Sequence, residues 1–257
     1  MSTSRKIAVA GATGRVGRHL VDILEAEGHE VAAISRSRGV DVITGDGLAE
    51  AVAGAEAIVD AATGPSPEEQ AATEFFTTAA RNLQEAGQRA GVERIVVVSI
   101  IGSDRFSGGY GAAKVAHEQA MLSGPIPARV LRAAQFHEFV AQLMEWGARG
   151  DVTYVPRMRT QLVAARTVAQ ALADLATASN GAASAGAPIL EIAGPREERL
   201  YEMATLLAAR RGDTARIEEA HDPADPVQAV YESGALLPGP GATLGGPTFE
   251  AWLAEAA

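Results

Sequence analysis

A tyrosine, a lysine and an upstream serine are the residues of this chain best suited to transferring a proton. Tyr110 and Lys114 stand four positions apart in a predicted helix, so their side chains leave the same side of one turn. The pKa of a free phenol is about 10, and an adjacent ammonium group lowers it by favouring the phenolate. Ser99 ends an apolar run upstream, and we expect its hydroxyl to hydrogen-bond a substrate oxygen beside Tyr110. The alternative is that Tyr110 only packs at the start of its helix and that Ser99 is a capping residue.

A glycine turn near the start of the chain has the spacing of a phosphate-binding element. Gly11, Gly14 and Gly17 directly follow the apolar run 7–10, and an amphipathic helix starts within the turn. In a dinucleotide-binding βαβ unit the first glycine permits the tight turn, the second lets the backbone approach a pyrophosphate and the third lets the helix pack close to the sheet. The free N–H groups of that helix then hold the phosphates. We therefore expect these residues to bind a dinucleotide: Gly11, Thr13, Gly14, Arg15, Val16 and Gly17.

The residues after the second predicted strand indicate which dinucleotide this is. In NAD-binding units an acidic residue about 20 positions beyond the glycines accepts hydrogen bonds from the adenosine ribose. Ser35 and Arg36 occupy that place here, and a hydroxyl and a guanidinium group bind a 2′-phosphate that a carboxylate would repel. Arg15 is placed to approach the same phosphate, so the pattern favours NADP(H). The alternative is that Arg36 is a solvated loop residue. Farther on, Asp46 is expected to accept a hydrogen bond from the adenine amino group or to cap the next helix, and the two roles are compatible.

The pattern of apolar runs predicts an α/β fold with a Rossmann-type, doubly wound parallel sheet and a small C-terminal lobe on the substrate side. Strand-like runs alternate with helix-like stretches up to about residue 150, which is typical of a parallel sheet with helices on both faces. The predicted strands are 7–10, 30–34, 40–44, 57–60, 94–99 and 128–131, and the predicted helices are 15–27, 47–53, 67–90, 110–122 and 136–146. Later strands are predicted at 152–155, 161–164 and 189–192, and later helices at 167–178, 199–211 and 249–254. We expect a dinucleotide-binding domain at 1–150 and the lobe at 151–257.

Composition excludes several classes of function. The net charge of −10 argues against a nucleic-acid-binding surface, which needs clustered Lys and Arg. The chain has no cysteine, and its five histidines are scattered without metal-ligand spacing, so we expect no metal site. No apolar run at the start is long enough for a signal peptide or a membrane span, so the cytoplasm is the expected location and no membrane partner is expected.

At these positions the chain resembles the short-chain dehydrogenase/reductase superfamily, and specifically its atypical, NmrA-like NAD(P)H-binding branch. The resemblance covers most of residues 5–178, and it rests on the glycine turn, Asp46 and the segments 61–63, 99–102, 110–114 and 132–139. It implies NADPH at the carboxyl edge of the sheet, with Ala62 and Thr63 among its contacts. It also implies Tyr110 as proton donor or acceptor, with Lys114 assisting at the nicotinamide ribose and Ser99 polarising the substrate. Ala133 departs from the proline that extended relatives usually carry after this arginine.

These inferences lead to three hypotheses of function. The first is an NADPH-dependent reductase of a small carbonyl or quinone-like substrate, the second an epimerase or dehydratase with retained NAD(P), and the third a redox sensor that binds NADP(H) without turnover. Phe136 and His137 follow the sixth predicted strand and are expected near the nicotinamide as substrate ligands, although a lone histidine is more often structural. The resemblance also leaves a homodimer open, through exposed faces of helices 67–90 and 110–122.

Overall fold

The computed structural model describes residues 4–179, 187–221 and 226–255 and groups the chain into two compact units. The first unit comprises residues 1–99, 107–132 and 168–190, and the second comprises 100–106, 133–167 and 191–257. The units therefore interleave and do not divide at residue 150 as expected. The reason is that loops after the strands β4 (Arg94–Ile100) and β5 (Ala128–Ala133) enter the second unit, while most of a later helix returns to the first.

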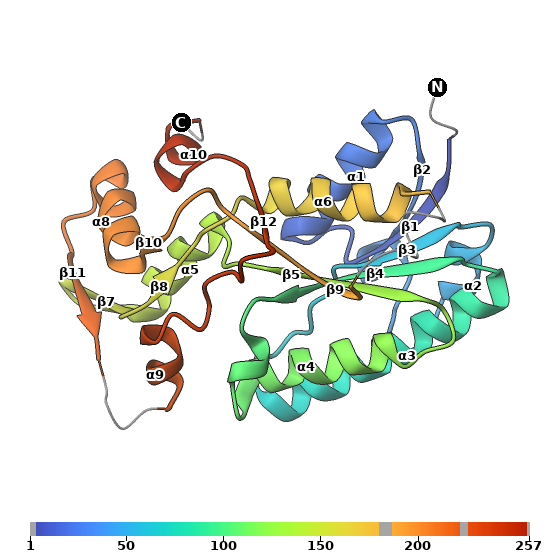
Figure 1. Cartoon of the computed structure of the whole chain (residues 1–257), viewed down its shortest axis with the longest axis horizontal. Helices are drawn as coiled ribbons and strands as arrows, with labels where there is room; N and C mark the ends of the chain where they lie inside the picture. Colours follow the sequence, from blue (N-terminus) through green and yellow to red (C-terminus); the bar gives the residue numbers. More distant parts are fainter. Residues whose placement is uncertain (1–3, 180–186, 222–225, 256–257) are drawn as a thin grey trace. The chain divides into compact units, whose positions relative to one another are not determined.

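A seven-stranded sheet in the order β12-β9-β5-β4-β3-β1-β2 confirms the Rossmann-type fold. Its other strands are β1 (Lys6–Ala10), β2 (Glu30–Ile34), β3 (Ala57–Asp60), β9 (Ile189–Ala193) and β12 (Thr243–Leu244). Within the first unit, α1 (Arg15–Ala26) and α6 (Ala165–Thr177) lie on one face of the sheet, and α3 (Glu69–Ala90) and α4 (Gly109–Leu122) lie on the other (Figure 1). Residues 7–10 of β1 and 57–59 of β3 have no exposed surface, which explains why these strands are continuous apolar runs.

The five helices predicted before residue 150 are confirmed, with ends that shift by one or two residues. They include α2 (Leu48–Val52) and α5 (His137–Gly147). Helix α1 buries the apolar stripe Val16, Leu20, Ile23 and Leu24, as its amphipathic pattern predicts. Helix α3 ends at Gly91, whose φ of 77° is the left-handed conformation that glycine adopts easily.

The strand predicted at 40–44 is wrong, because this segment forms turns. Local side chains satisfy its backbone: Asp41 Oδ1 accepts from Ile43 N at 2.7 Å. The Asn82 amide of α3 donates to the carbonyls of Val42 and Ile43 at 2.8 and 2.9 Å. These bonds replace the ladder that a strand would need. The apolar pattern arises instead because Val42 packs into the core.

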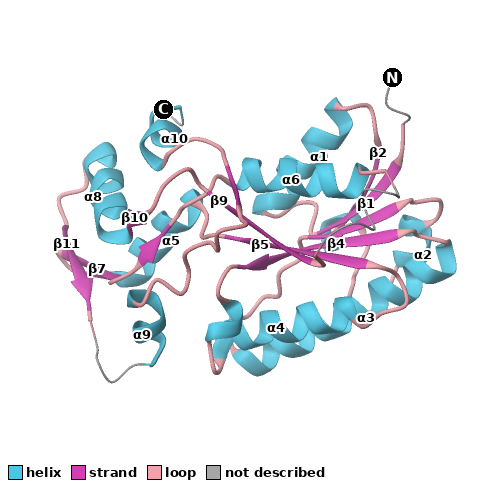
Figure 2. Cartoon of the chain, viewed as in Figure 1, coloured by secondary structure: helices cyan, strands magenta, loops and turns pink. Residues whose placement is uncertain are grey.

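The second unit has its own core around two short sheets. Strand β7 (Val152–Pro156) pairs in parallel with β11 (Arg216–Ala220), and helices α5 and α8 (Leu200–Arg211) pack beside them (Figure 2). The remaining elements are β6 (Ala148–Arg149), β8 (Arg159–Thr160), β10 (Glu198–Arg199), α9 (Pro226–Glu232) and α10 (Phe249–Glu255). The strand predicted at 161–164 is wrong, because its backbone bonds go to separate partners: Gln161 O accepts from Gly194 N, and Val163 N donates to Gln135 O.

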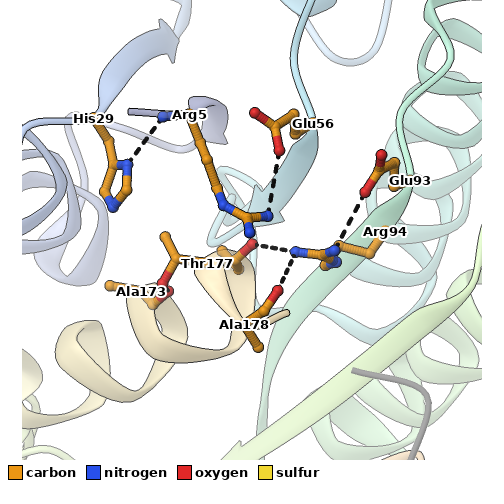
Figure 3. A network of polar contacts seen from close by, with 9 residues as sticks. Arg5, His29, Glu56, Glu93, Arg94, Ala173, Thr177 and Ala178 are labelled. Carbon is orange, nitrogen blue, oxygen red and sulfur yellow. Dashed lines mark hydrogen bonds and ion pairs between the residues drawn. The ribbon is translucent and has the colours of Figure 1, made fainter. Parts of the chain in front are cut away.

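Hydrogen bonds from Arg94, the first residue of β4, connect the amino end of the sheet to the end of α6 (Figure 3). The Arg94 guanidinium is buried and donates from one nitrogen to the carbonyls of Ala176 and Ala178, both at 2.9 Å. It also donates to Glu93 at 3.3 Å, and nearby Arg5 pairs with Glu56 at the same distance. A cation at the carboxyl end of a helix satisfies its last carbonyls and interacts favourably with its dipole.

No helix within the described ranges is long and apolar enough to cross a membrane.

Candidate functional site

The glycine turn joins β1 to α1 with little room for side chains. Gly11 has a φ of 74°, and a Cβ there would lie 2.6 Å from Ala61 O. A Cβ on Gly17 would lie 2.0 Å from Gly11 O. These two contacts fit the roles expected of the tight turn and of the close helix packing. Gly14 is the N-cap of α1 and has no side chain to satisfy the first N–H groups of the helix. Those groups, with the dipole of a twelve-residue helix behind them, suit a phosphate.

The end of β2 lies directly beside this turn. The backbone N–H groups of Gly11 and Ala12 donate to Ile34 O at 3.0 and 3.3 Å. The next residues are Ser35, which is partly buried, and Arg36, which is exposed. The Ser35 hydroxyl lies 3.0 Å from the Ser37 hydroxyl. The end of β2 is thus hydrogen-bonded to the glycine turn that precedes α1, and Ser35 and Arg36 follow directly after it.

Asp46 does not cap the following helix. The N-cap of α2 is Gly47, in the left-handed conformation at φ 69°, and no side chain caps it. The Asp46 carboxylate instead accepts a hydrogen bond from the Thr44 hydroxyl at 2.7 Å in an exposed turn. The capping alternative is therefore wrong, and a contact with an adenine amino group stays a prediction.

Tyr110 reaches across to the loop after β3. Its hydroxyl hydrogen-bonds the Thr63 side chain, and its ring meets Phe76 edge-on, with centroids 5.7 Å apart. Burial raises the pKa of Tyr110 above its ordinary 10.0, and the bond to Thr63 opposes this shift only in part. The expected lowering of this pKa by Lys114 is therefore wrong: desolvation disfavours the phenolate, and no effect of the Lys114 charge is resolved on Tyr110.

Lys114 lies in a buried chain of hydrogen bonds that the sequence did not reveal. Its Nζ donates to Val98 O at 2.9 Å and lies 2.9 Å from His117 Nδ1. On the other side of the ring, His117 Nε2 lies 2.9 Å from Asp60 Oδ2. Burial lowers the pKa of Lys114 to about 8, against the opposing effect of Asp60 and Glu118. Asp60 ends a buried strand and His117 follows Lys114 by three positions, but no pattern in the sequence shows that they meet.

Ser99 occupies the carboxyl end of β4 with an unsatisfied hydroxyl. The residue is 3% exposed, and its Oγ is among the few buried side-chain atoms of the described residues that have no hydrogen-bond partner. Strands β3 and β4 pair at Asp60 and Val97, so the same register continued by two residues sets Ser99 level with Ala62. A buried polar atom left unpaired costs free energy, which makes this hydroxyl a candidate ligand contact.

Phe136 and His137 belong to the second unit. Phe136 forms an isolated bridge with Val163. The His137 ring is 1% exposed, lies 3.1 Å through Nε2 from Pro247 O and packs against Phe249 and Trp252. Burial lowers the pKa of His137 to about 4, so the ring is neutral near pH 7. Their role as substrate ligands stays a prediction.

The residues of the first unit together fit a dinucleotide. Gly11 and Gly17 leave no room for a Cβ in the turn, the N-cap Gly14 has no side chain to bond the first N–H groups of α1, and the buried Ser99 hydroxyl lies unpartnered at the same sheet edge. Ligands of open α/β sheets bind beyond the carboxyl ends of the strands, which is where these features lie.

Comparison with known proteins agrees with this geometry. Residues 11–135 match a family model described as NAD(P)H-binding. Residues 11–135 therefore form an NAD(P)H-binding domain. The resemblance inferred from the sequence is confirmed at this level, and its narrower NmrA-like assignment stays a prediction. No curated protein sequence matches the chain.

Solved structures with the same fold cover between 85% and 98% of this chain. A short-chain dehydrogenase/reductase superfamily protein from Agrobacterium tumefaciens with bound NAD has 18% identity and a TM-score of 0.69, over 98% of this chain and 95% of that one. MoeE5 in complex with UDP-glucose and NAD has 20% identity and a TM-score of 0.70, over 97% and 96% of the two chains. UDP-N-acetylglucosamine 4-epimerase from Bacillus cereus has 19% identity and a TM-score of 0.65, over 85% and 86%.

Proposed function

We propose that the protein is an NADP(H)-dependent oxidoreductase that reduces a small carbonyl or quinone-like substrate, with Tyr110 as the proton donor and Ser99 and Lys114 assisting. The observation that carries the proposal is the pair of hydroxyls at one sheet edge: a phenol held by Thr63 and the unpartnered Oγ of Ser99. Two hydroxyls of this kind suit a substrate oxygen, one by donating a proton and the other by donating a hydrogen bond.

The raised pKa of Tyr110 suits a proton donor, which is the role that reduction of a carbonyl requires. Because burial raises this pKa, the phenol keeps its proton near neutral pH and is ready to give it to an oxygen that gains negative charge. The bound dinucleotide would supply the hydride to the carbonyl carbon. Ser99 would hold the carbonyl oxygen in position, and Lys114 would bind a ribose hydroxyl.

The preference for NADP(H) over NAD(H) rests on the residues beside the glycine turn. Ser35 and Arg36 follow β2 where an NAD-binding unit carries an acidic residue, and Arg15 opens α1 next to them. A guanidinium group binds a phosphate through strong, charge-assisted hydrogen bonds.

Titration of the purified protein with NADPH and with NADH, followed by nicotinamide fluorescence, tests the cofactor assignment. We expect NADPH to bind more tightly, and Arg36→Ala and Arg15→Ala to weaken NADPH binding by roughly tenfold or more, the loss of a charged contact worth about 1.5–3 kcal/mol. Arg89→Ala, an exposed arginine on α3, serves as the control. Equal affinity for both dinucleotides contradicts the NADP(H) assignment.

Substitution Tyr110→Phe then tests the chemistry, because it removes the proton donor and keeps the ring. We expect kcat for reduction of an active carbonyl or quinone to fall by roughly 10²–10⁴-fold while the Kd for NADPH stays unchanged. Turnover that survives this substitution contradicts the role of Tyr110. Binding of NADPH without turnover of any carbonyl or quinone would favour the redox-sensor hypothesis.

An epimerase or dehydratase of sugar nucleotides is the second candidate. It is favoured by the similar structures that hold UDP-glucose or carry the name of a UDP-N-acetylglucosamine epimerase. This function predicts that NAD(P) co-purifies with the protein and that conversion of a UDP-sugar consumes no NADPH. Absorbance at 340 nm during turnover separates the two candidates.

A further inference from the structure

The chemistry of Asp60 and Lys114 decides which atoms donate and which accept in the buried hydrogen-bond chain of Asp60, His117 and Lys114. A carboxylate only accepts, so the atom of His117 that faces Asp60, Nε2, must carry the ring proton. In a neutral ring Nδ1 is then an acceptor, and it lies 2.9 Å from the Lys114 ammonium, which only donates. The hydrogen-bond chain therefore has the negative Asp60 on one side of a neutral His117 ring and the positive Lys114 on the other, and the charges of these three residues sum to zero.

The three side chains of the hydrogen-bond chain are tightly packed and have little freedom to move. Asp60, Lys114 and His117 are all less than 5% exposed. The Phe76 ring from α3 stacks on His117, with centroids 4.7 Å apart, and lies 4.3 Å from Lys114 Nζ. The second oxygen of Asp60 accepts from Ala62 N at 2.9 Å, so the carboxylate is fixed as well.

The charged groups that act on Lys114 and His117 come from two elements, β3 and α4. Asp60 comes from β3, and Glu118 comes from α4 itself. Glu118 is paired with Arg132 of β5 at 2.7 Å, whereas α3 presents the uncharged Phe76 ring and β4 presents the Val98 carbonyl. Asp60 is therefore the carboxylate that bonds directly to His117.

We propose that Asp60 and His117 are positioning residues that orient the Lys114 ammonium group, so that two of its N–H groups are held inside the protein and the third remains for a dinucleotide ribose. Val98 O and His117 Nδ1 engage two N–H groups, and within the described part of the chain the third has no oxygen or nitrogen partner. Without this arrangement a flexible lysine side chain loses the order that its role requires. The role toward the dinucleotide rests on the proposed function, whereas the hydrogen-bond chain itself does not.

The substitution Asp60→Asn tests the chain because it keeps the size of the side chain and changes only its bonding. The substituted amide has one acceptor oxygen, and if Ala62 N retains it, the amide NH₂ faces His117 Nε2 and makes that nitrogen an acceptor. The proton then moves to Nδ1, where it points at the Lys114 ammonium. We expect the neutral tautomer of His117 to change from Nε2–H to Nδ1–H, and the pKa of Lys114 to fall by about one pH unit or more.

Nuclear magnetic resonance gives both readouts without enzyme activity. The chain has only two lysines, Lys6 and Lys114, so a Lys6→Arg protein labelled at lysine Nζ gives a single signal, and ¹⁵N-labelled histidine reports the tautomer. Asp41→Asn is the matched control, because Asp41 also accepts from the backbone N–H two residues later. An unchanged tautomer together with an unchanged Lys114 pKa in Asp60→Asn overturns the proposal.

Two variants of His117 keep the test decisive if Asp60→Asn does not fold. The amide of His117→Asn can accept a hydrogen bond near the place of Nδ1, whereas His117→Phe cannot. We expect His117→Asn to preserve most of the NADPH affinity and His117→Phe to weaken it by roughly fivefold or more, with thermal melts as the check on folding. Equal affinity in both variants contradicts the positioning role. If the unmodified protein binds no dinucleotide, the proposed function fails while the tautomer measurement still decides the hydrogen-bond chain.

Discussion

At the scale of single residues, two opposing effects govern the Tyr110 hydroxyl. Burial disfavours the phenolate, and the hydrogen bond from Thr63 favours it. Substitution Thr63→Val removes the second effect, so we predict that the pKa of Tyr110 rises further above 10.0. Absorbance at 295 nm in an alkaline titration, compared with a Tyr110→Phe protein, measures this shift directly. A lower pKa in Thr63→Val would show that Thr63 does not stabilise the phenolate.

Burial of His137 makes the free energy of unfolding depend on pH. Its folded-state pKa is about 4, below the ordinary 6.5, so between these values the unfolded chain binds a proton that the folded chain does not. The contribution of this residue to stability is therefore complete above pH 6.5 and is lost as the pH falls toward 4. We predict that about 2–3 kcal/mol of unfolding free energy is lost over this window. Urea unfolding at pH 7 and pH 5 should show a smaller difference in His137→Gln than in the unmodified protein.

His117 contributes in the same direction, because burial and Lys114 also lower its pKa. The His137→Gln protein should therefore keep part of the pH dependence. A His137→Gln protein whose pH dependence equals that of the unmodified chain would contradict the burial of a neutral His137.

At the scale of the elements, α6 depends on a side chain from β4. Arg94 donates to two carbonyls at the end of α6 and is buried where it does so. We predict that Arg94→Gln lowers the free energy of unfolding by about 1.5–3 kcal/mol, the range for hydrogen bonds from a charged group. Urea unfolding measures the loss. Arg89, whose side chain is 69% exposed, is the control: Arg89→Gln should change stability by less than about 0.5 kcal/mol. Equal losses in the two variants would contradict the capping role.

Elements with a strong local pattern could be predicted from the sequence, and elements held by distant contacts could not. The apolar run before Gly11 predicts β1 and the apolar stripe of residues 16–24 predicts α1, because the apolar residues of each pattern are buried in the folded protein. Strand β11 has three charged residues among five, and it forms because it pairs with β7. The same limit applies at the site: Tyr110 and Lys114 share a helix turn, but Asp60 and His117 meet only across 57 positions of sequence.

At the scale of the whole molecule, the interleaving of the two units has a direct consequence for folding. Most of α6 belongs to the first unit although it follows residue 150. Six residues of α6 have no exposed surface: Ala165, Val168, Ala169, Leu172, Ala173 and Ala176. Burying a valine or leucine side chain contributes about 1.5–3 kcal/mol, so two such residues alone contribute about 3–6 kcal/mol, against a typical total stability of about 5–15 kcal/mol.

We therefore predict that a fragment of residues 1–150 does not fold, although it contains the whole glycine turn and Lys114. The fragment lacks α6, so the Arg94 guanidinium loses its carbonyl partners and the part of the sheet face that α6 covers beside α1 is exposed. A fragment of residues 1–190 contains every segment of the first unit and should retain more helix and a cooperative urea transition. Circular dichroism and sedimentation of the two fragments measure the difference. A monomeric, cooperatively unfolding 1–150 fragment would show that the first unit does not need α6, because the cover that α6 gives to the sheet would then be dispensable.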